Sequence, residues 1–232
     1  MTNFPQRSQL PSPKVLYKPN KKGNTDFFEH LSLTTKEKQA LRSQIGMMAI
    51  THVLDSTTTN IPAGEAVKQL VVLEVTLKEE PDVTLFQALD QRLGFYLIFK
   101  LIQKNGNVSY LINYKEPIKT NQNGVLYKII RNFESSEEIT LDYGVSTLDV
   151  LYDQIVKEVA KDELSSEQTE DVRLAIVKKQ EQEKLEKKAA QLKKKMFAAK
   201  AMRQQMSYRK DYQETLAALK KLTEHVENKG RL

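Results

Sequence analysis

The sequence contains no cysteine, which excludes disulfide bonds, thiolate catalysis and cysteine-ligated zinc. Its histidines, His30, His52 and His225, stand in separate segments without metal-site spacing, so we expect packing or surface roles. The phosphate-binding GxxxxGK[ST], dinucleotide-binding GxGxxG and nucleophilic GxSxG motifs are also missing. The sequence therefore offers no visible means of hydrolysing a nucleotide, and it predicts a protein without enzymatic activity, cofactor or metal.

Long apolar runs are absent as well. No stretch approaches the roughly 18 apolar residues that a membrane-spanning helix needs. The first thirty residues lack the continuous apolar run of a signal peptide. Because the missing cysteines also fit a reducing interior, we expect a soluble, cytoplasmic protein that makes no membrane contact.

Positive charge is distributed unevenly along the 232 residues. The whole chain has 36 basic and 30 acidic residues, a formal net charge of +6. Residues 178–221 contain fourteen basic and five acidic residues, a net charge of +9, which leaves −3 for the remainder. This contrast predicts a nearly neutral body with a cationic extension rather than a uniformly basic protein.

The composition predicts three parts. Residues 1–13 hold three of the seven prolines among polar residues and predict a flexible arm. Residues 14–161 carry alternating strand and helix signals, and we expect them to form an α+β domain. Residues 166–228 predict a basic, coiled-coil-like helical extension, since glycine and proline are missing from 145 to 229.

Local signals define the elements expected in the α+β domain. Thr34 and Glu37 have the spacing of a capping box, and Asn105-Gly106 between apolar runs indicates a β-hairpin with a type I′ turn. Five strands with mostly short connections favour a mostly antiparallel sheet packed by helices. In chain order we expect a helix over 35–45, strands over 47–55 and 67–78, a helix from 82 ended by Gly94, the hairpin, a strand over 126–133, and a helix over 147–160 capped by Ser146.

The helical extension has heptad-like periodicity. Apolar residues recur at seven-residue intervals and then continue in a shifted register, so a bend or hairpin turn is expected near 207–211. Lys188, Lys195 and Arg209 fall where a strong dimer would place leucine, so we expect the extension to need a further surface, from its own domain or from another protein. The residues predicted to bind a partner are Leu185, Leu192, Met196, Met206, Leu216 and Leu219.

Nucleic acid is an alternative ligand for the same extension. From Lys187 to Lys210 the sequence has nine basic residues and no acidic one, so its cations could neutralise several phosphates of duplex DNA without reading the sequence. Only Phe197 and Tyr208 are available for base stacking, and a solvated lysine-rich surface has the same composition. The candidate nucleic-acid contacts are Lys187, Lys188, Lys193, Lys194, Lys195, Lys200 and Arg203.

A second alternative is metal-dependent nuclease chemistry on the strand over 67–78. Glu74 and Lys78 share one face of that strand, and Asp82 follows it. Nucleases of this kind place a glutamate and a lysine two residues apart, whereas here the two are four apart, or roughly 13 Å. A surface ion pair is therefore the better interpretation, and Asp142, Asp149 and Asp153 fit helix-start or helix-surface positions.

Several segments occur in an order that resembles the bacterial domain-of-unknown-function family 4391. The resemblance extends over roughly residues 15–222 and rests on order and pattern rather than on a sharp signature. In chain order it is carried by FFEH, QLVVLEVTLK, LFQALDQRLGFYLIFKLIQ, SYLINYKE, LDVLYDQIVKEV and the terminal lysine-rich helix.

The resemblance implies a context rather than a reaction. Members look like companions of helicase and DNA methyltransferase genes in restriction-like and phage-defence loci. No catalytic residue is carried over to this chain. The resemblance implies a non-enzymatic accessory subunit that docks on a helicase or methyltransferase partner through its C-terminal helices, in agreement with the composition.

Overall fold

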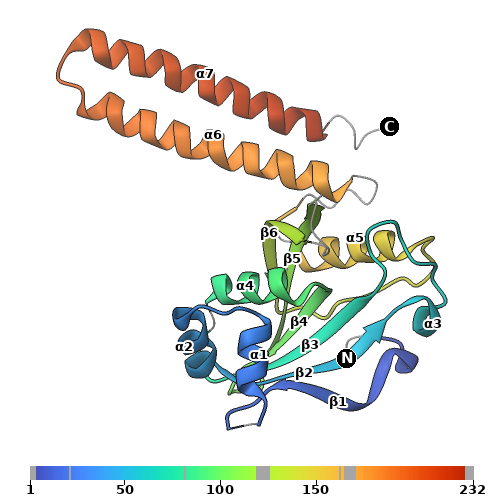
Figure 1. Cartoon of the computed structure of the whole chain (residues 1–232). Helices are drawn as coiled ribbons and strands as arrows, with labels where there is room; N and C mark the ends of the chain where they lie inside the picture. Colours follow the sequence, from blue (N-terminus) through green and yellow to red (C-terminus); the bar gives the residue numbers. More distant parts are fainter. Residues whose placement is uncertain are drawn as a thin grey trace. The chain divides into compact units, whose positions relative to one another are not determined.

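The computed structural model describes residues 4–20, 22–80, 82–118, 126–161, 163–164 and 171–227. The chain forms two compact units, divided after Lys161. The first unit holds a sheet with helices, and the second holds two long helices (Figure 1). Across the described ranges, no helix combines the length and the apolar character needed to cross a membrane.

The first unit is built on a six-stranded sheet whose strands lie in chain order. Strands β3 and β4 are parallel and all other neighbours are antiparallel. A parallel pair needs a crossover, and helix α4 supplies it. The predicted α+β fold with a mostly antiparallel sheet is confirmed. The strands are β1 (Gln9–Tyr17), β2 (Ile45–Leu54), β3 (Leu70–Leu77), β4 (Tyr96–Ile102), β5 (Val108–Ile118) and β6 (Leu126–Ser135).

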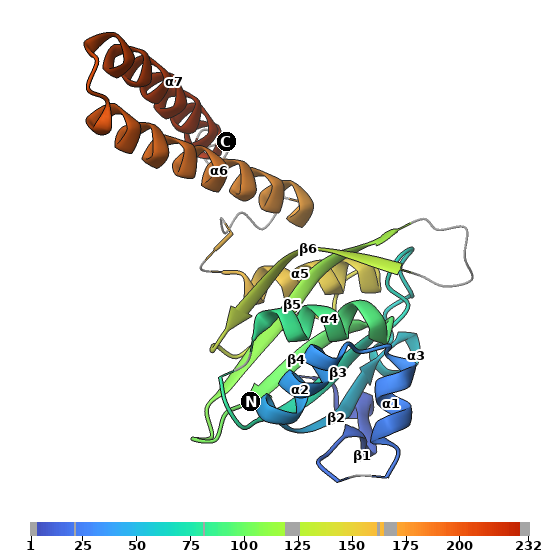
Figure 2. The same ribbon diagram turned by 60° about the vertical axis from the view of Figure 1, so that its left-hand side comes forward.

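Helices cover both faces of this sheet. Helices α1, α2 and α4 lie on one face and α5 lies on the other (Figures 1 and 2). On the first face the rings of Phe86 and Phe99 meet edge to face at 5.1 Å, and on the second Tyr96 and Tyr152 do so at 4.8 Å. The helices of this unit are η1 (Gln6–Ser8), α1 (Asn24–His30), α2 (Thr35–Gln44), α3 (Ser56–Thr59), α4 (Val83–Leu93) and α5 (Leu148–Val159).

Strand β1 corrects the prediction of a flexible arm. Residues 9–13 belong to this strand and pair with β2, so the arm interpretation is wrong for them. The register shifts between Gln9 and Lys14, around Pro11 and Pro13. Proline lacks the N–H that a central strand must donate, but it is tolerated at a sheet edge, where β1 lies. This edge strand is the reason why the sheet has six strands rather than five.

The hairpin of β4 and β5 forms as predicted, but its turn does not. The Gly106 N–H donates to the Gln103 carbonyl at 2.9 Å, and Gly106 has a φ of +84°. Asn105 is absent from the described residues with positive φ, whereas a type I′ turn requires positive φ at both central positions. The turn is therefore a type I turn followed by a glycine in the left-handed region, and the type I′ prediction is wrong.

The predicted capping box at the start of α2 is confirmed. The Thr34 hydroxyl accepts from the Glu37 N–H at 3.3 Å, and the Glu37 carboxylate accepts from the Thr34 N–H at 2.7 Å. Arg92 of α4 also donates to Glu37, at 2.8 Å, so the cap joins two helices. At α5 the capping side chain is Thr147 rather than the predicted Ser146.

Asp149 fixes the start of α5 against a distant loop. Its carboxylate accepts from the N–H groups of Glu65 at 2.6 Å and Val67 at 2.7 Å. A Cβ at Gly64 would lie 2.2 Å from the Asp149 carboxylate, so this position admits only glycine. Asp149 is a helix-start acid, as expected. Rather than facing only solvent, it binds the backbone of Val67, which is 82 residues away in sequence.

A buried ion pair connects the elements of this unit. The Lys115 ammonium lies 2.5 Å from an Asp90 carboxylate oxygen, and neither side chain is exposed to solvent. Lys115 also donates to the Phe95 carbonyl, and Asn113 donates to the second Asp90 oxygen at 2.9 Å. Tyr152 of α5 donates to the Asn113 carbonyl at 2.9 Å, which brings α4, β5 and α5 into one network.

The ionisation of this pair is set by burial and by mutual attraction. Burial raises the pKa of Asp90, and the positive charge of Lys115 opposes that increase. Burial lowers the pKa of Lys115, and the negative charge of Asp90 opposes that decrease. The rings of Tyr96 and Tyr127 lie 5.4 and 4.5 Å from the ammonium and add cation–π contacts. Each charge therefore depends on its partner.

Breaking this pair should lower the free energy of unfolding far more than breaking an exposed ion pair does. We expect Lys115→Met to lower the free energy of unfolding by about 3–5 kcal/mol, because Asp90 would be left as a buried carboxyl group without its cation. Removing both charges with Asp90→Leu and Lys115→Met should recover part of that loss. The control is Lys100→Met, which breaks a half-exposed pair with Glu74 and should change stability by less than about 1 kcal/mol. Urea denaturation measures all three, and equal losses in both single variants would contradict the expectation.

The Glu37 cap should make stability depend on pH in the acid range. The side-chain hydrogen bond from Arg92 is the main cause that lowers the pKa of Glu37 from 4.5 to about 2. Since the carboxylate binds its proton less readily in the folded chain, its stabilisation is complete above pH 4.5 and disappears as the pH falls toward 2. The free energy of unfolding of wild type should exceed that of Glu37→Gln by about 1 kcal/mol at neutral pH, and this difference should disappear in acid.

The control for this titration is Glu29→Gln, which makes the same charge change at an exposed position on α1. Denaturation of wild type and both variants across the acid range measures the difference. A gap between wild type and Glu37→Gln that stays constant with pH would contradict the assignment of the cap.

Candidate partner-binding surface on the helical hairpin

The second unit is an antiparallel hairpin of α6 (Val172–Ala198) and α7 (Met202–Glu227). Each helix has one row of less exposed side chains that repeats every three and four residues, as in a coiled coil. Ala189 and Thr215, the most buried members, are 7% and 3% exposed. We call the two rows the seam. It comprises Gln182, Leu185, Ala189, Leu192 and Met196 on α6, and Gln205, Tyr208, Tyr212, Thr215, Leu219 and Leu222 on α7.

The chain reverses at residues 199–201, earlier than the predicted bend near 207–211. Ala199 ends α6 with extended backbone, at φ −70° and ψ 123°, and α7 then runs without interruption through residues 207–211. The bend prediction is wrong because it treated Met206 as a seam residue, which created an apparent change of phase. In the structure Gln205 and Tyr208 occupy the seam, and the repeat continues unbroken along α7.

Four of the six residues predicted to bind a partner lie in the seam. Leu185, Leu192 and Met196 on α6 and Leu219 on α7 are half-buried. Their apolar groups lie in the contact between α6 and α7 of the same chain. Each helix of the hairpin thus supplies to the other much of the further surface that we expected from the chain's own domain or from another protein.

The other two predicted residues are exposed, and two further apolar residues join them. Met206 is 65% and Leu216 is 42% exposed. Phe197 and Met202, beside the reversal of the chain, are each 71% exposed and were not proposed as partner contacts from the sequence. A helix-turn signal at 199–201 would have pointed to them, but the segment has neither glycine nor proline. Together with Leu174 and Val177 near the start of α6, which are 56% and 48% exposed, these four are the large exposed apolar side chains of the hairpin's described residues.

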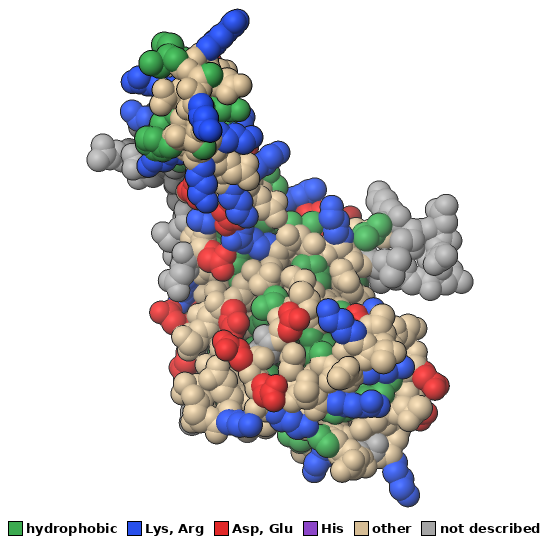
Figure 3. Space-filling view, turned by 90° about the vertical axis from the view of Figure 1, so that its left-hand side faces the viewer, with side chains coloured by type: hydrophobic (Ala, Val, Ile, Leu, Met, Phe, Trp, Pro, Cys, Tyr) green, Lys and Arg blue, Asp and Glu red, His purple; other side chains and the backbone are tan. Residues whose placement is uncertain are grey.

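Cations surround the exposed apolar groups. All seven residues predicted to contact nucleic acid are exposed, as are Arg209 and Lys210 of α7. Figure 3 shows apolar and basic side chains intermixed on the hairpin. Lys210 approaches Glu214 at 3.9 Å, a solvated pair of little energetic weight. The seven predicted residues are Lys187, Lys188, Lys193, Lys194, Lys195, Lys200 and Arg203.

A hollow of about 410 Å³ marks one side of the seam. Lys188 from α6 and Asp211 and Ala218 from α7 all line it, so these residues flank the seam on the same side. Glu214 lines it as well, which gives this side of the hairpin two carboxylates. The exposed apolar residues Phe197, Met202, Met206 and Leu216 are absent from its lining.

The nuclease constellation does not assemble in the first unit. Glu74 pairs with Lys100 of the neighbouring strand at 3.0 Å, and Lys78 donates to the Arg42 carbonyl at 2.9 Å. Asp82 caps α4 by accepting from the Thr84 N–H at 2.9 Å. In the described ranges no group of three or more histidines and acidic residues has the arrangement of a metal site.

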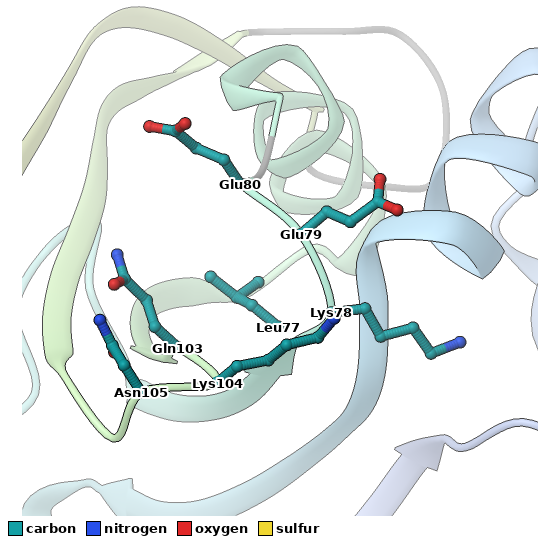
Figure 4. Close-up of a pocket in the computed structure, with 7 residues that line it drawn as sticks. All are labelled: Leu77, Lys78, Glu79, Glu80, Gln103, Lys104 and Asn105. Carbon is teal, nitrogen blue, oxygen red and sulfur yellow. The ribbon is translucent and has the colours of Figure 1, made fainter.

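A hollow of about 360 Å³ lies where β3 and β4 end. Figure 4 shows that Lys78 and Glu79 point away from Glu80 and Gln103, so the polar groups do not converge on one centre. Leu77 is also part of the lining. Catalytic sites aim several polar groups at one reacting atom, and this hollow lacks that arrangement.

The histidines that the structure describes are separated as the sequence indicates. His30 is the last residue of α1 and is exposed. His52 on β2 is half-buried, with its ring centroid 5.3 Å from that of Phe4. Burial lowers the pKa of His52, and its Nδ1 lies 3.0 Å from the Thr51 hydroxyl. This environment is that of a packing residue.

Comparison with known proteins gives a family and no function. No curated protein and no solved structure matches the chain. A family described as Domain of unknown function (DUF4391) matches residues 21–219, which include strands β2 to β6, helices α1 to α6 and most of α7. Since this match extends over most of the 232 residues, the chain belongs to the DUF4391 family.

Proposed function

We propose that this protein is a non-enzymatic accessory subunit that binds a partner protein through the hairpin of α6 and α7. The observation that carries the proposal is the exposure of four large apolar side chains beside a seam that is already closed. Phe197, Met202, Met206 and Leu216 are 42–71% exposed within one unit. Clustered exposed apolar groups with a polar surround are typical of protein interaction sites.

The body supports this proposal by what its polar groups do. Burial shifts the pKa values of Asp90, Lys115 and the nearby Tyr152, and these groups are held in one network of hydrogen bonds. The half-exposed carboxylate of Glu74 is paired with Lys100. Polar groups used in this way position elements of the fold, which suits a docking module better than a catalyst.

The partner that we propose is a helicase or DNA methyltransferase of a bacterial restriction-like or anti-phage system. The support is the resemblance to a family whose members look like companions of such genes. An accessory role also fits the hairpin, because its surface offers contacts without chemistry of its own.

Removing the hairpin should abolish assembly. We expect a variant that ends at residue 165 to lose co-purification with the helicase or methyltransferase of its own locus, whereas full-length protein retains it. The first unit has its own hydrophobic core, so circular dichroism and urea denaturation of the shortened variant serve as the control for folding. Unchanged co-purification by a folded, shortened variant would contradict the proposal.

Binding of duplex DNA is a second candidate function, and the charge of the hairpin favours it. Nine basic residues and no acidic residue occur from Lys187 to Lys210. All nine side chains are exposed, so they can approach phosphates. Such binding would be independent of sequence and sensitive to salt.

Substitution of three adjacent lysines tests the DNA candidate. We expect Lys193, Lys194 and Lys195→Gln to weaken duplex binding and to reduce the slope of log affinity against log salt by about 2–3. Fluorescence anisotropy of a labelled duplex over a salt series measures both. The matched control is Lys14, Lys18 and Lys36→Gln, which removes three exposed cations from the first unit. Equal effects of the two triple variants would rule out the hairpin as the DNA site.

A further inference from the structure

Helix α7 carries a second row of side chains at coiled-coil spacing, next to the seam. Its positions follow one another at intervals of four, three, four, three and four residues. All of them are exposed, whereas the seam row of the same helix is half-buried or buried. A helix with two adjacent heptad rows can contact two neighbouring helices at once. The row comprises Met202, Met206, Arg209, Gln213, Leu216 and Lys220.

Phe197 of α6 lies on the same side of the hairpin as this row. In an antiparallel pair, the positions that follow the seam on each helix meet on one side, and those that precede it meet on the other. Lys188 and Asp211 precede seam residues and line one hollow together, as this rule requires. Lys193 and Phe197 follow the seam residues Leu192 and Met196, so they lie on the side opposite the hollow, with the second row of α7.

This side is apolar in its centre and positively charged around it. Phe197 and Met202 are 71% exposed, and Met206 and Leu216 are 65% and 42% exposed. The cations of this side are Lys193, Arg209 and Lys220. The acidic residues that the same rule places on this side, Glu183 and Glu186, follow Gln182 and Leu185, farther from the reversal of the chain than Lys193. The carboxylates of Asp211 and Glu214 lie on the other side, beside the hollow.

We propose that this side binds an amphipathic helix of a partner protein, with acidic residues flanking the partner's apolar row. The inference rests on the proposed function, since it specifies how the hairpin contacts its partner. The binding face consists of Lys193, Phe197, Met202, Met206, Arg209 and Leu216. A third helix that packs here fills a groove between two helices with heptad-spaced apolar groups, and glutamates beside that row pair with Lys193 and Arg209.

Charge argues against a second copy of this chain as the occupant. Residues 178–221 of each copy carry a net charge of +9, and Lys193 and Arg209 would face their equivalents across a dry contact. Like charges in such a contact are strongly unfavourable. Nucleic acid fits this face less well than an acidic helix, because Phe197 is its one aromatic ring and Met202, Met206 and Leu216 offer none for stacking on bases.

Two synthetic helices test the inference with the full-length chain. Both peptides have leucine at the first and fourth positions of four heptads. They differ only in having glutamate or lysine at the positions that flank this leucine row. We expect the glutamate peptide to bind at least about tenfold more tightly than the lysine peptide, with an advantage that shrinks as salt rises. Fluorescence anisotropy of labelled peptides measures the affinities. Equal affinity of the two peptides would overturn the inference.

Variants of the face locate the site. We expect Met202, Met206 and Leu216→Ser to weaken binding of the glutamate peptide by at least about tenfold. The matched control is Leu174 and Val177→Ser, which removes exposed apolar side chains from the opposite side of α6. An equal loss in that control, or no loss in the triple variant, would overturn the inference.

A charge variant keeps the test informative if the serine variants unfold. Lys193 and Arg209→Glu leaves every apolar group in place, and it should reverse the preference so that the lysine peptide binds more tightly. Sedimentation of the unmodified chain checks self-association, and a labelled duplex checks nucleic acid. Dimerisation through the same face, or competition by duplex at the expense of the peptide, would overturn the inference in favour of that occupant.

The failure of this inference and the failure of the proposed function can be told apart. If co-purification of the native partner requires the hairpin but is unchanged by both the serine and the glutamate variants, the proposed function stands and the binding face is wrong. If the native partner ignores removal of the hairpin altogether, the proposed function is wrong, whatever the peptides do.

Discussion

Contact between α6 and α7 along one row of side chains each determines which groups of the hairpin remain available. The centre of that contact is small, since Ala189 and Thr215 are its most buried members. Met206 and Leu216 directly follow the seam residues Gln205 and Thr215, so the phase of the repeat points them away from the other helix. Met206 and Leu216 are thereby left on the adjoining side, where Phe197 and Met202 also lie. The exposure of these side chains therefore follows from the phase of the seam.

The first unit is organised by a different interaction. Asp90 and Lys115 are fully buried, and each carries a charge that only the other neutralises. Their hydrogen bonds extend to Asn113 and through it to Tyr152, so an error in the placement of one element would leave charges unsatisfied in several. Buried polar networks of this kind favour a single arrangement of the core over alternatives. The sheet is therefore held in a unique arrangement, while the hairpin has separate contacts of its own.

Short-range signals were sufficient to predict much of this molecule. The capping box of Thr34 and Glu37 and the hairpin of β4 and β5 depend on residues within a few positions of one another, and both were recognised from the sequence. The link from Glu37 to Arg92 and the pair of Asp90 with Lys115 join residues 55 and 25 positions apart. Nothing in the local pattern around either residue indicates such a partner, because the pairing exists only after the sheet has formed.

The candidate surface shows the same limit in another form. Hydrophobicity placed Met206 in the seam, although geometry puts Gln205 and Tyr208 there. An aromatic side chain with a polar tip and an amide can both lie at a half-exposed helix contact, so apolar character alone does not fix the phase of a repeat. The exposed cations were identified correctly as exposed by their chemistry. What the sequence did not reveal was that the exposed apolar groups share one side of the hairpin with Lys193 and Arg209.

The short connection at residues 199–201 has a consequence for how such proteins diverge. Because both rows of α7 repeat every seven residues, adding one heptad to each helix would restore every row in register and move the reversal outward by about 10 Å. The length of the arm can thus change in steps without redesign of either side. Relatives with hairpins of different length could therefore present equivalent contacts at different positions along the hairpin.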